Sequence, residues 1–112
     1  PLAIALMARG RTGEAIERYE QALSLKPDNA MALNNLGLAL AKMNRVPEAI
    51  DRFEEAVKIN PGFASAHNNL GVALTQVNRL QEAIAEFEQA VRIDPGFERA
   101  RSNLRSLTEG RH

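Results

Sequence analysis

The sequence predicts an all-α fold of stacked antiparallel helix hairpins, and three observations support this prediction. A 34-residue period relates Pro27, Pro61 and Pro95, and 21 of 34 positions are identical when residues 30–63 are laid over residues 64–97. Apolar residues recur every three or four positions, which is the helical period. The composition is 45% hydrophobic with no Trp and one Tyr, so a core of mostly Leu, Ile, Ala and Phe is expected. A fixed period of this length is typical of a solenoid.

Net charge and cysteine content exclude several classes of protein. The 112 residues carry 14 Lys and Arg against 14 Asp and Glu, so the basic excess that favours binding to nucleic acid or to an anionic membrane is missing. No apolar run reaches the roughly 20 residues that span a bilayer. The absence of Cys excludes disulfides and thiolate metal sites, and it favours a reducing compartment such as the cytoplasm.

One domain of repeated units is expected over residues 1–112. Its predicted parts are a partial repeat over residues 1–29, a second repeat over 30–63, a third over 64–97, and a capping helix with a tail over 98–112. The chain opens in mid-helix at Leu2, Ile4, Leu6 and Met7 with no capping residue. This pattern predicts either further sequence before Pro1 or self-association through an uncapped N-terminal edge.

Each complete unit is predicted to contain two helices, at residues 30–43 and 47–59, and again at 64–77 and 80–93. Pro47 is compatible with the second helix, because proline is tolerated in a first helical turn. Pro61 and Pro95 follow the second helices, where the residue before proline is driven out of helical geometry. Asn44-Arg45 and the equivalent Asn78-Arg79 are predicted to form the shorter turns.

Small residues indicate close packing between the helices. Gly37 and Gly71 lie in mid-helix at a cost of about 0.8–1 kcal/mol each relative to Ala, which a close approach can offset. Ala49, Ala56, Ala83 and Ala90 are predicted to admit a neighbouring backbone. Phe53 and Phe87 are predicted to fill the space between layers.

These residues together resemble the tetratricopeptide repeat family. The family pattern of Leu-Gly, then Ala, an aromatic residue, Ala and Pro occurs as Leu36-Gly37, Ala49, Phe53, Ala56, Pro61, again as Leu70-Gly71, Ala83, Phe87, Ala90, Pro95, and in part as Ala15, Tyr19, Ala22, Pro27. Leu33 and His67 stand where the family has a bulky aromatic residue, and Leu40 and Leu74 where it has Tyr. The resemblance implies a right-handed α-α superhelix that serves as an interaction scaffold.

A capping helix is expected over residues 98–109, which resemble the first helix of a further unit. Arg105 stands at the position of Gly37 and Gly71, where a long cation cannot occupy a close helix contact. Solenoids require such a polar end.

An asparagine recurs once per unit at Asn35, Asn69 and Asn103, and Asn34 and Asn68 precede two of them. Asn is a mediocre helix former, so recurring Asn inside helices indicates hydrogen-bond partners. In the resembling family the first helices line a concave face, where an amide can bind the backbone of an extended peptide. The alternative is a ladder of Asn side chains that fixes the stacking of the units.

The predicted peptide-binding face also includes apolar and polar neighbours of this series. The full set is Asn34, Asn35, Leu38, Lys42, Asn68, Asn69, Val72, Gln76, Arg99 and Asn103. Some family members hold a C-terminal carboxylate with Lys, Asn and Arg. Of the matching positions here, only Asn69 and Arg99 are compatible with that clamp, so a chaperone C-terminus is disfavoured and an extended segment held by its backbone is favoured.

The leading hypothesis is therefore a non-catalytic protein-interaction scaffold with no metal or cofactor and a protein or peptide as partner. His67 has no Asp, Glu, Cys or His three or four residues away, so packing is the expected role. One alternative is the substrate-recognition array of a larger enzyme, such as the Asn-bearing arrays of protein glycosyltransferases. The other is a self-assembly module that acts through its repeat ends.

Overall fold

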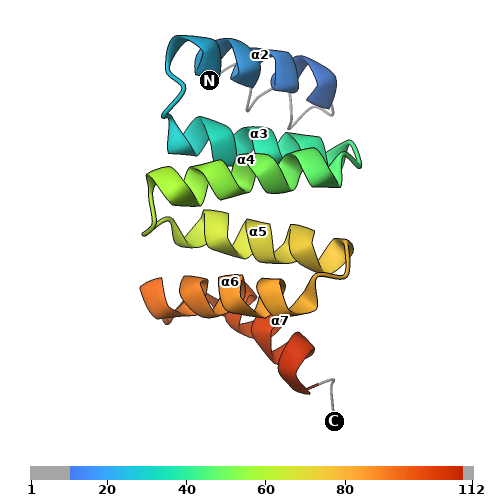
Figure 1. Cartoon of the computed structure of the whole chain (residues 1–112), viewed down its shortest axis with the longest axis vertical. Helices are drawn as coiled ribbons and strands as arrows, with labels where there is room; N and C mark the ends of the chain where they lie inside the picture. Colours follow the sequence, from blue (N-terminus) through green and yellow to red (C-terminus); the bar gives the residue numbers. More distant parts are fainter. Residues whose placement is uncertain (1–10, 110–112) are drawn as a thin grey trace.

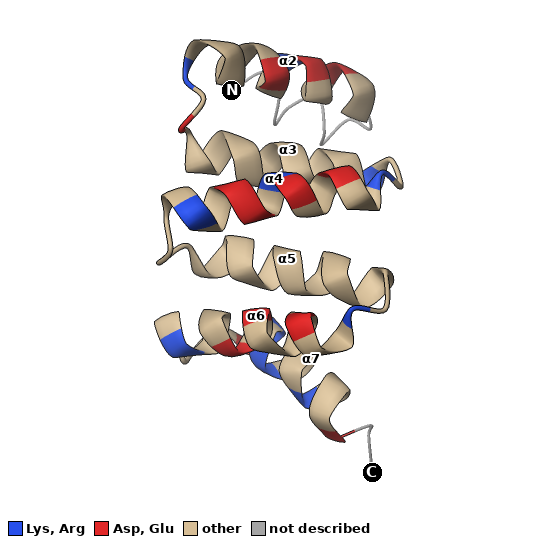
Figure 2. Cartoon of the chain, in the orientation of Figure 1, with Lys and Arg blue, Asp and Glu red and all other residues tan. Residues whose placement is uncertain are grey.

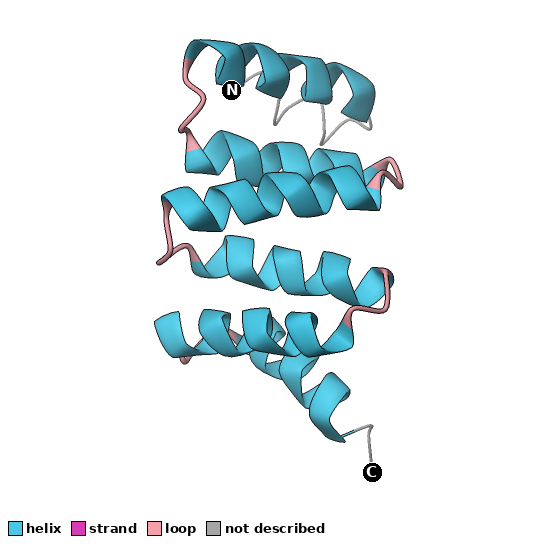
Figure 3. Cartoon of the chain, viewed as in Figure 1, coloured by secondary structure: helices cyan, strands magenta, loops and turns pink. Residues whose placement is uncertain are grey.

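Six helices form the part of the chain that the computed structural model describes, residues 11–109. They are α2 (Thr12–Leu25), α3 (Ala30–Lys42), α4 (Val46–Ile59), α5 (Ala64–Gln76), α6 (Leu80–Ile93) and α7 (Glu98–Glu109). They stack with their axes across the long dimension of the molecule (Figure 1), and only loops join them (Figure 3). The predicted all-α solenoid is therefore confirmed.

The turns inside the units set the ends of α3 and α5. Asn44 and Asn78 have φ of 62° and 63°, the left-handed conformation that Asn tolerates better than most residues. Arg45 N donates to Leu40 O at 2.8 Å and Asn44 N donates to Ala41 O at 3.0 Å, and the same pair of bonds closes α5. This is a Schellman motif. The helices consequently stop at Lys42 and Gln76, one residue before the predicted ends.

The order of contacts defines which helices lie on the inside of the curved stack. Each helix packs on the next along the chain, most extensively within the hairpins α3–α4 and α5–α6. The first helices α3, α5 and α7 also contact one another in succession, and consecutive second helices approach each other less. A stack that is tighter on one side curves toward that side. The face formed by α3, α5 and α7 is therefore the concave face.

The core depends on a contact between an aromatic ring and a glycine inside each hairpin. Phe53 and Phe87 are 1% and 2% exposed. A Cβ placed on Gly37 would lie 2.5 Å from Phe53 Cε1, and one on Gly71 would lie 2.6 Å from Phe87 Cε1. These glycines thus permit a close approach, as predicted, because the ring of the facing helix occupies the space that a Cβ would need. Each ring fills its own hairpin, in addition to contributing to the common core between layers.

The C-terminal end of the stack is more polar than the interior. Among the residues of α7, Ala100 is buried, and Leu104 and Leu107 are half-buried against the core. Arg101 and Arg105 are exposed, at the positions that His67 and Gly71 hold in the preceding unit. α7 thus exposes cations at two positions that are buried in α5, and its role as a capping helix stays a prediction. Figure 1 shows it running obliquely away from the stack.

Two sequence-based expectations concern the ends of the chain and the membrane. The predicted N-terminal edge, Leu2, Ile4, Leu6 and Met7, lies outside the described residues. Within residues 11–109, none of the helices has both the length and the apolar character needed to cross a membrane.

The ring-on-glycine contact predicts an unusual effect of Gly→Ala substitution. Ala normally stabilises a helix relative to Gly. Because a Cβ would overlap a buried ring, Gly37→Ala and Gly71→Ala are each expected to lower the free energy of unfolding by about 1–3 kcal/mol. Urea denaturation measures this change.

The matched control is Gly13→Ala in the first turn of α2, where a Cβ meets no atom within 4 Å. This variant is expected to be as stable as the native chain, or more stable by about 0.4–1 kcal/mol. Equal stability changes at Gly13 and Gly71 would contradict the explanation.

Candidate functional site

The predicted binding residues all lie on the three helices of the concave face. α3 carries Asn34, Asn35, Leu38 and Lys42, α5 carries Asn68, Asn69, Val72 and Gln76, and α7 carries Arg99 and Asn103. Since these helices contact one another in order, the set forms a strip over three adjoining layers, in which Asn34 and Asn68 are buried and the other eight residues are half-buried or exposed. The strip is a candidate groove for an elongated ligand.

Within this strip the asparagines form hydrogen bonds between successive units. Asn69 Nδ2 donates to Asn34 Oδ1 at 3.0 Å, which joins α5 to α3. Asn103 Nδ2 donates to Asn68 Oδ1 at 3.1 Å, which joins α7 to α5. Each bond links an Asn of one layer to the first Asn of the layer before it. The asparagine series therefore contributes to the register of the stack.

The two kinds of Asn differ in burial. Asn34 and Asn68 are 6% and 3% exposed, so they lie beneath the groove surface and in the interface between layers. Asn35, Asn69 and Asn103 are half-buried. An amide has two N–H donors and a carbonyl acceptor, and one ladder bond uses a single donor of Asn69 or Asn103. The half-buried amides thus retain groups that a peptide backbone can bind.

Apolar groups accompany these amides on the concave face, and charged groups are few. Leu38 and Val72 are each 38% exposed at equivalent positions of α3 and α5. Figure 2 shows α5 with no charged residue and the charge of the molecule concentrated elsewhere. Lys42 and Arg99 are the cations of the predicted set, and Arg99 lies over the ring of Phe97 with its guanidinium carbon 5.9 Å from the centroid.

His67 is buried at 8% exposure and has two hydrogen-bond partners from other segments. Its Nδ1 lies 2.7 Å from Glu86 Oε1 of α6, and its Nε2 lies 2.8 Å from Pro61 O in the turn before α5. Both partners are acceptors, so the doubly protonated imidazolium satisfies the arrangement best. The hydrogen bond to Glu86 raises the pKa of His67 despite the opposing effect of burial.

Sequence reasoning missed this ion pair because it considered only partners within the same helix. Glu86 is 19 residues away and comes close only when the hairpin forms. A signal was present in the repeat, because Leu33 and Arg52 of one unit are replaced together by His67 and Glu86 in the next. The new residues, an imidazole and a carboxylate, are groups that can pair in direct contact.

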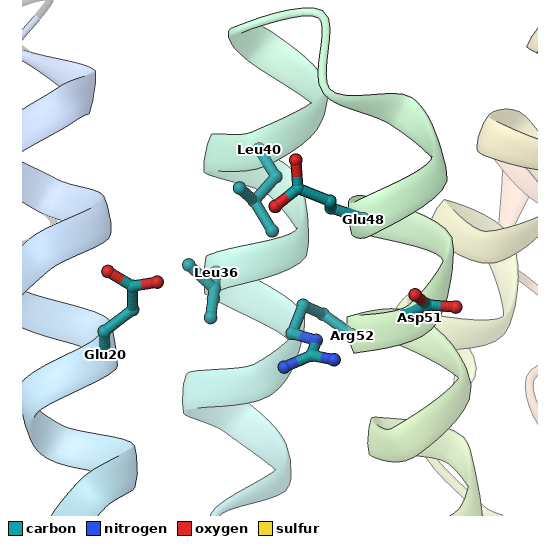
Figure 4. A pocket seen from close by; sticks show the side chains of 6 residues that line it. All are labelled: Glu20, Leu36, Leu40, Glu48, Asp51 and Arg52. Atoms are coloured by element: carbon teal, nitrogen blue, oxygen red, sulfur yellow. The ribbon is translucent and has the colours of Figure 1, made fainter.

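Away from the concave face, a hollow of about 120 Å³ lies between α2 and α4, with α3 as its floor. Figure 4 shows Glu20 of α2 on one side of the hollow, Leu36 and Leu40 of α3 in the middle, and Glu48, Asp51 and Arg52 of α4 on the other side. The carboxylates are exposed, and Arg52 forms an ion pair with Glu55 at 2.8 Å. Within residues 11–109, His, Asp and Glu side chains form no group that could hold a metal ion.

The architecture defines a class of protein, a solenoid of helix hairpins with an amide-bearing concave face. A family model described as Tetratricopeptide repeat matches residues 1–62 and 39–96. The chain belongs to the tetratricopeptide repeat family. No curated protein matches the sequence significantly.

Solved structures with the same fold include domains that bind peptides. The crystal structure of MamA has a TM-score of 0.92 at 29% identity and covers 97% of this chain, which spans 64% of MamA. The first TPR of Spaghetti (RPAP3), bound to the HSP90 peptide SRMEEVD, has a TM-score of 0.93 at 22% identity, with 96% of this chain and 86% of that one covered. The Sgt2 TPR domain from Aspergillus fumigatus has a TM-score of 0.91 at 24% identity, with coverages of 96% and 73%. The last two likenesses, both below 25% identity, show the fold alone.

The asparagine ladder predicts that Asn69→Ala is destabilising. The substitution leaves Asn34 Oδ1 buried without its partner, so we expect the free energy of unfolding to fall by about 1–3 kcal/mol. Asn35→Ala is the control, because Asn35 holds the equivalent position in α3 without a ladder bond to a described residue. A double-mutant cycle between Asn34 and Asn69 measures their coupling, and additive effects would contradict the ladder.

The imidazolium of His67 predicts a pH-dependent stability. Its folded pKa lies above the ordinary value of 6.5, so its stabilising contribution is complete below pH 6.5 and is lost as the pH rises through the folded pKa. Urea denaturation from about pH 6 to about pH 9 should show stability falling in the native chain. His67→Leu, which restores the residue of the preceding unit, should remove the contribution of His67 to the fall of the unfolding free energy with pH. If the unfolding free energy falls equally steeply with pH in both proteins, the imidazolium assignment is contradicted.

Proposed function

We propose that this chain is a non-catalytic protein-interaction scaffold that binds an extended polypeptide segment along its concave face. The proposal rests chiefly on the half-buried amides of Asn69 and Asn103, which follow one another from layer to layer with hydrogen-bonding groups to spare. Each offers both a donor and an acceptor, the same pair that a peptide unit presents.

The spacing of the layers supports an extended ligand. Packed helices lie about 8–10 Å apart, and an extended chain advances by about 3.3 Å per residue. One amide per layer thus matches about every third residue of the ligand. Hydrogen bonds to the ligand backbone give affinity, and contacts with Leu38 and Val72 give selectivity.

Peptide complexes of structural neighbours are consistent with this use of the fold. The first TPR of Spaghetti (RPAP3) holds the HSP90 peptide SRMEEVD, and the second TPR domain of human RPAP3, at 24% identity and a TM-score of 0.90, holds the HSP70 peptide SGPTIEEVD. Both peptides end in acidic residues. In this chain only Asn69 and Arg99 fit a carboxylate clamp, so an internal segment bound through its backbone is favoured over an acidic C-terminus.

The groove can be tested without cutting the asparagine ladder. Val72→Glu places a charge on the concave face, and Ile93→Glu places the same charge on α6 at a position of equal exposure, 38%. In pull-downs from a cell extract, we expect the native chain and Ile93→Glu to retain the same proteins and Val72→Glu to lose them. Thermal unfolding of all three proteins checks that they are equally folded.

The outcomes separate the proposed surface from its alternatives. A partner set retained equally by all three proteins would place binding outside the groove. Retention of nothing but the chain itself would favour self-assembly through the repeat ends. Either result would overturn the proposal.

A further inference from the structure

A hollow of about 180 Å³ opens on the concave face between α5 and α7. Its walls are Val72, Thr75 and Gln76 on α5 and Asn103, Ser106 and Leu107 on α7. Phe87, buried at 2% exposure, forms part of its lining from α6. The hollow therefore lies in the strip that the proposed peptide follows.

The size of the hollow has a cause in the repeat. Ser106 holds the position that Val72 holds in the preceding layer and Leu38 in the one before it. Each step toward the C-terminus thus removes apolar volume from the concave face. A serine leaves space over the Phe87 ring that a valine would fill. Cavities of about 150 Å³ with apolar walls accept a benzene-sized group, so this hollow can accept one aliphatic side chain.

Two of the polar groups around the hollow, on Thr75 and Asn103, have partners within the chain. Thr75 Oγ1 donates to Gly71 O at 2.8 Å, so its hydroxyl is bonded within α5. Asn103 Nδ2 donates to Asn68 Oδ1, which holds the amide at the edge of the hollow. The groups left to contact a guest are chiefly the apolar surfaces of Val72, Phe87 and Leu107.

The charge distribution limits the guest to an uncharged one. α5 contains no Asp, Glu, Lys or Arg, and its His67 is buried in the pair with Glu86. Arg99 lies near the start of α7, about two helical turns before Ser106. A carboxylate or ammonium group in the hollow would lose hydration without gaining a partner of opposite charge, which is costly.

We propose that the hollow between α5 and α7 is a specificity pocket for one Val, Ile or Leu side chain of an uncharged extended segment. This inference rests on the proposed function. The amides of Asn69 and Asn103 bind the backbone on either side of the guest residue, and the pocket selects the side chain. The occupant is a polypeptide from a partner protein, bound away from its own termini.

The test uses random peptides displayed with either a free or a fused C-terminus and selected on the immobilised full chain. We expect enrichment of uncharged peptides with Val, Ile or Leu at one fixed position, independent of a free C-terminus. Synthetic versions of the enriched peptides with blocked termini are then measured by fluorescence anisotropy. Replacing the aliphatic residue with Ala should weaken binding by about 10-fold to 200-fold, the range for methylene groups in a hydrophobic pocket.

Two substitutions in the chain locate the effect. Ser106→Val fills the hollow with the residue of the preceding layer and should weaken binding of the selected peptides by at least about tenfold. In this variant, replacing the aliphatic residue of the peptide with Ala should cause no further loss of affinity. Ser102→Val is the matched control on the exposed surface of α7 and should bind as the native chain does. Val72→Ala enlarges the hollow and should shift the selected residue toward Phe or Met.

The outcomes distinguish the pocket from the groove. The selected peptides could bind Val72→Glu weakly but bind Ser106→Val as tightly as the native chain. That result would overturn the pocket and leave the proposed function standing. Enrichment of acidic peptides with a free C-terminus would also overturn the pocket. If no peptide is enriched, both the pocket and the proposed function fail.

Discussion

The contact between a phenylalanine ring and a glycine inside each hairpin is the constraint on which the rest of the structure depends. Phe53 over Gly37 and Phe87 over Gly71 set the distance between the two helices of a unit. With that distance fixed, buried alanines such as Ala49 and Ala83 fit without voids. Because interiors are close-packed, this spacing is transmitted to the next layer. The concave face is the consequence of hairpins that all close in the same way.

The concave face combines two tasks that the sequence places side by side. Asn34 and Asn68 are buried and accept a ladder bond, and the half-buried Asn69 and Asn103 of the following layers donate it. One residue type therefore joins the layers and, in the proposed function, presents amide groups to a ligand. Substituting Asn69 or Asn103 would change both binding and stability, so charges placed at Val72 and Ile93 test the groove more directly.

Differences between otherwise similar units account for the features peculiar to this chain. The replacement of Leu33 and Arg52 by His67 and Glu86 introduces a partly buried ion pair that depends on pH. The series Leu38, Val72, Ser106 opens a hollow at one end of the groove. Arg105 in place of glycine excludes a further ring-on-glycine contact at the end of the stack. The shared residues make the solenoid, and the departures distinguish this chain from a uniform repeat.

The sequence by itself determined the helices, their turns and their pairing, because these follow from a 34-residue period, glycine and proline positions and helical spacing, all of which are local. It also placed all ten candidate residues on first helices. Only the tertiary structure decided that Asn69 bonds to Asn34, that Glu86 reaches His67, and that a hollow opens beside Ser106. Each of these depends on the distance and angle between packed helices, which side-chain packing sets and no periodic pattern encodes.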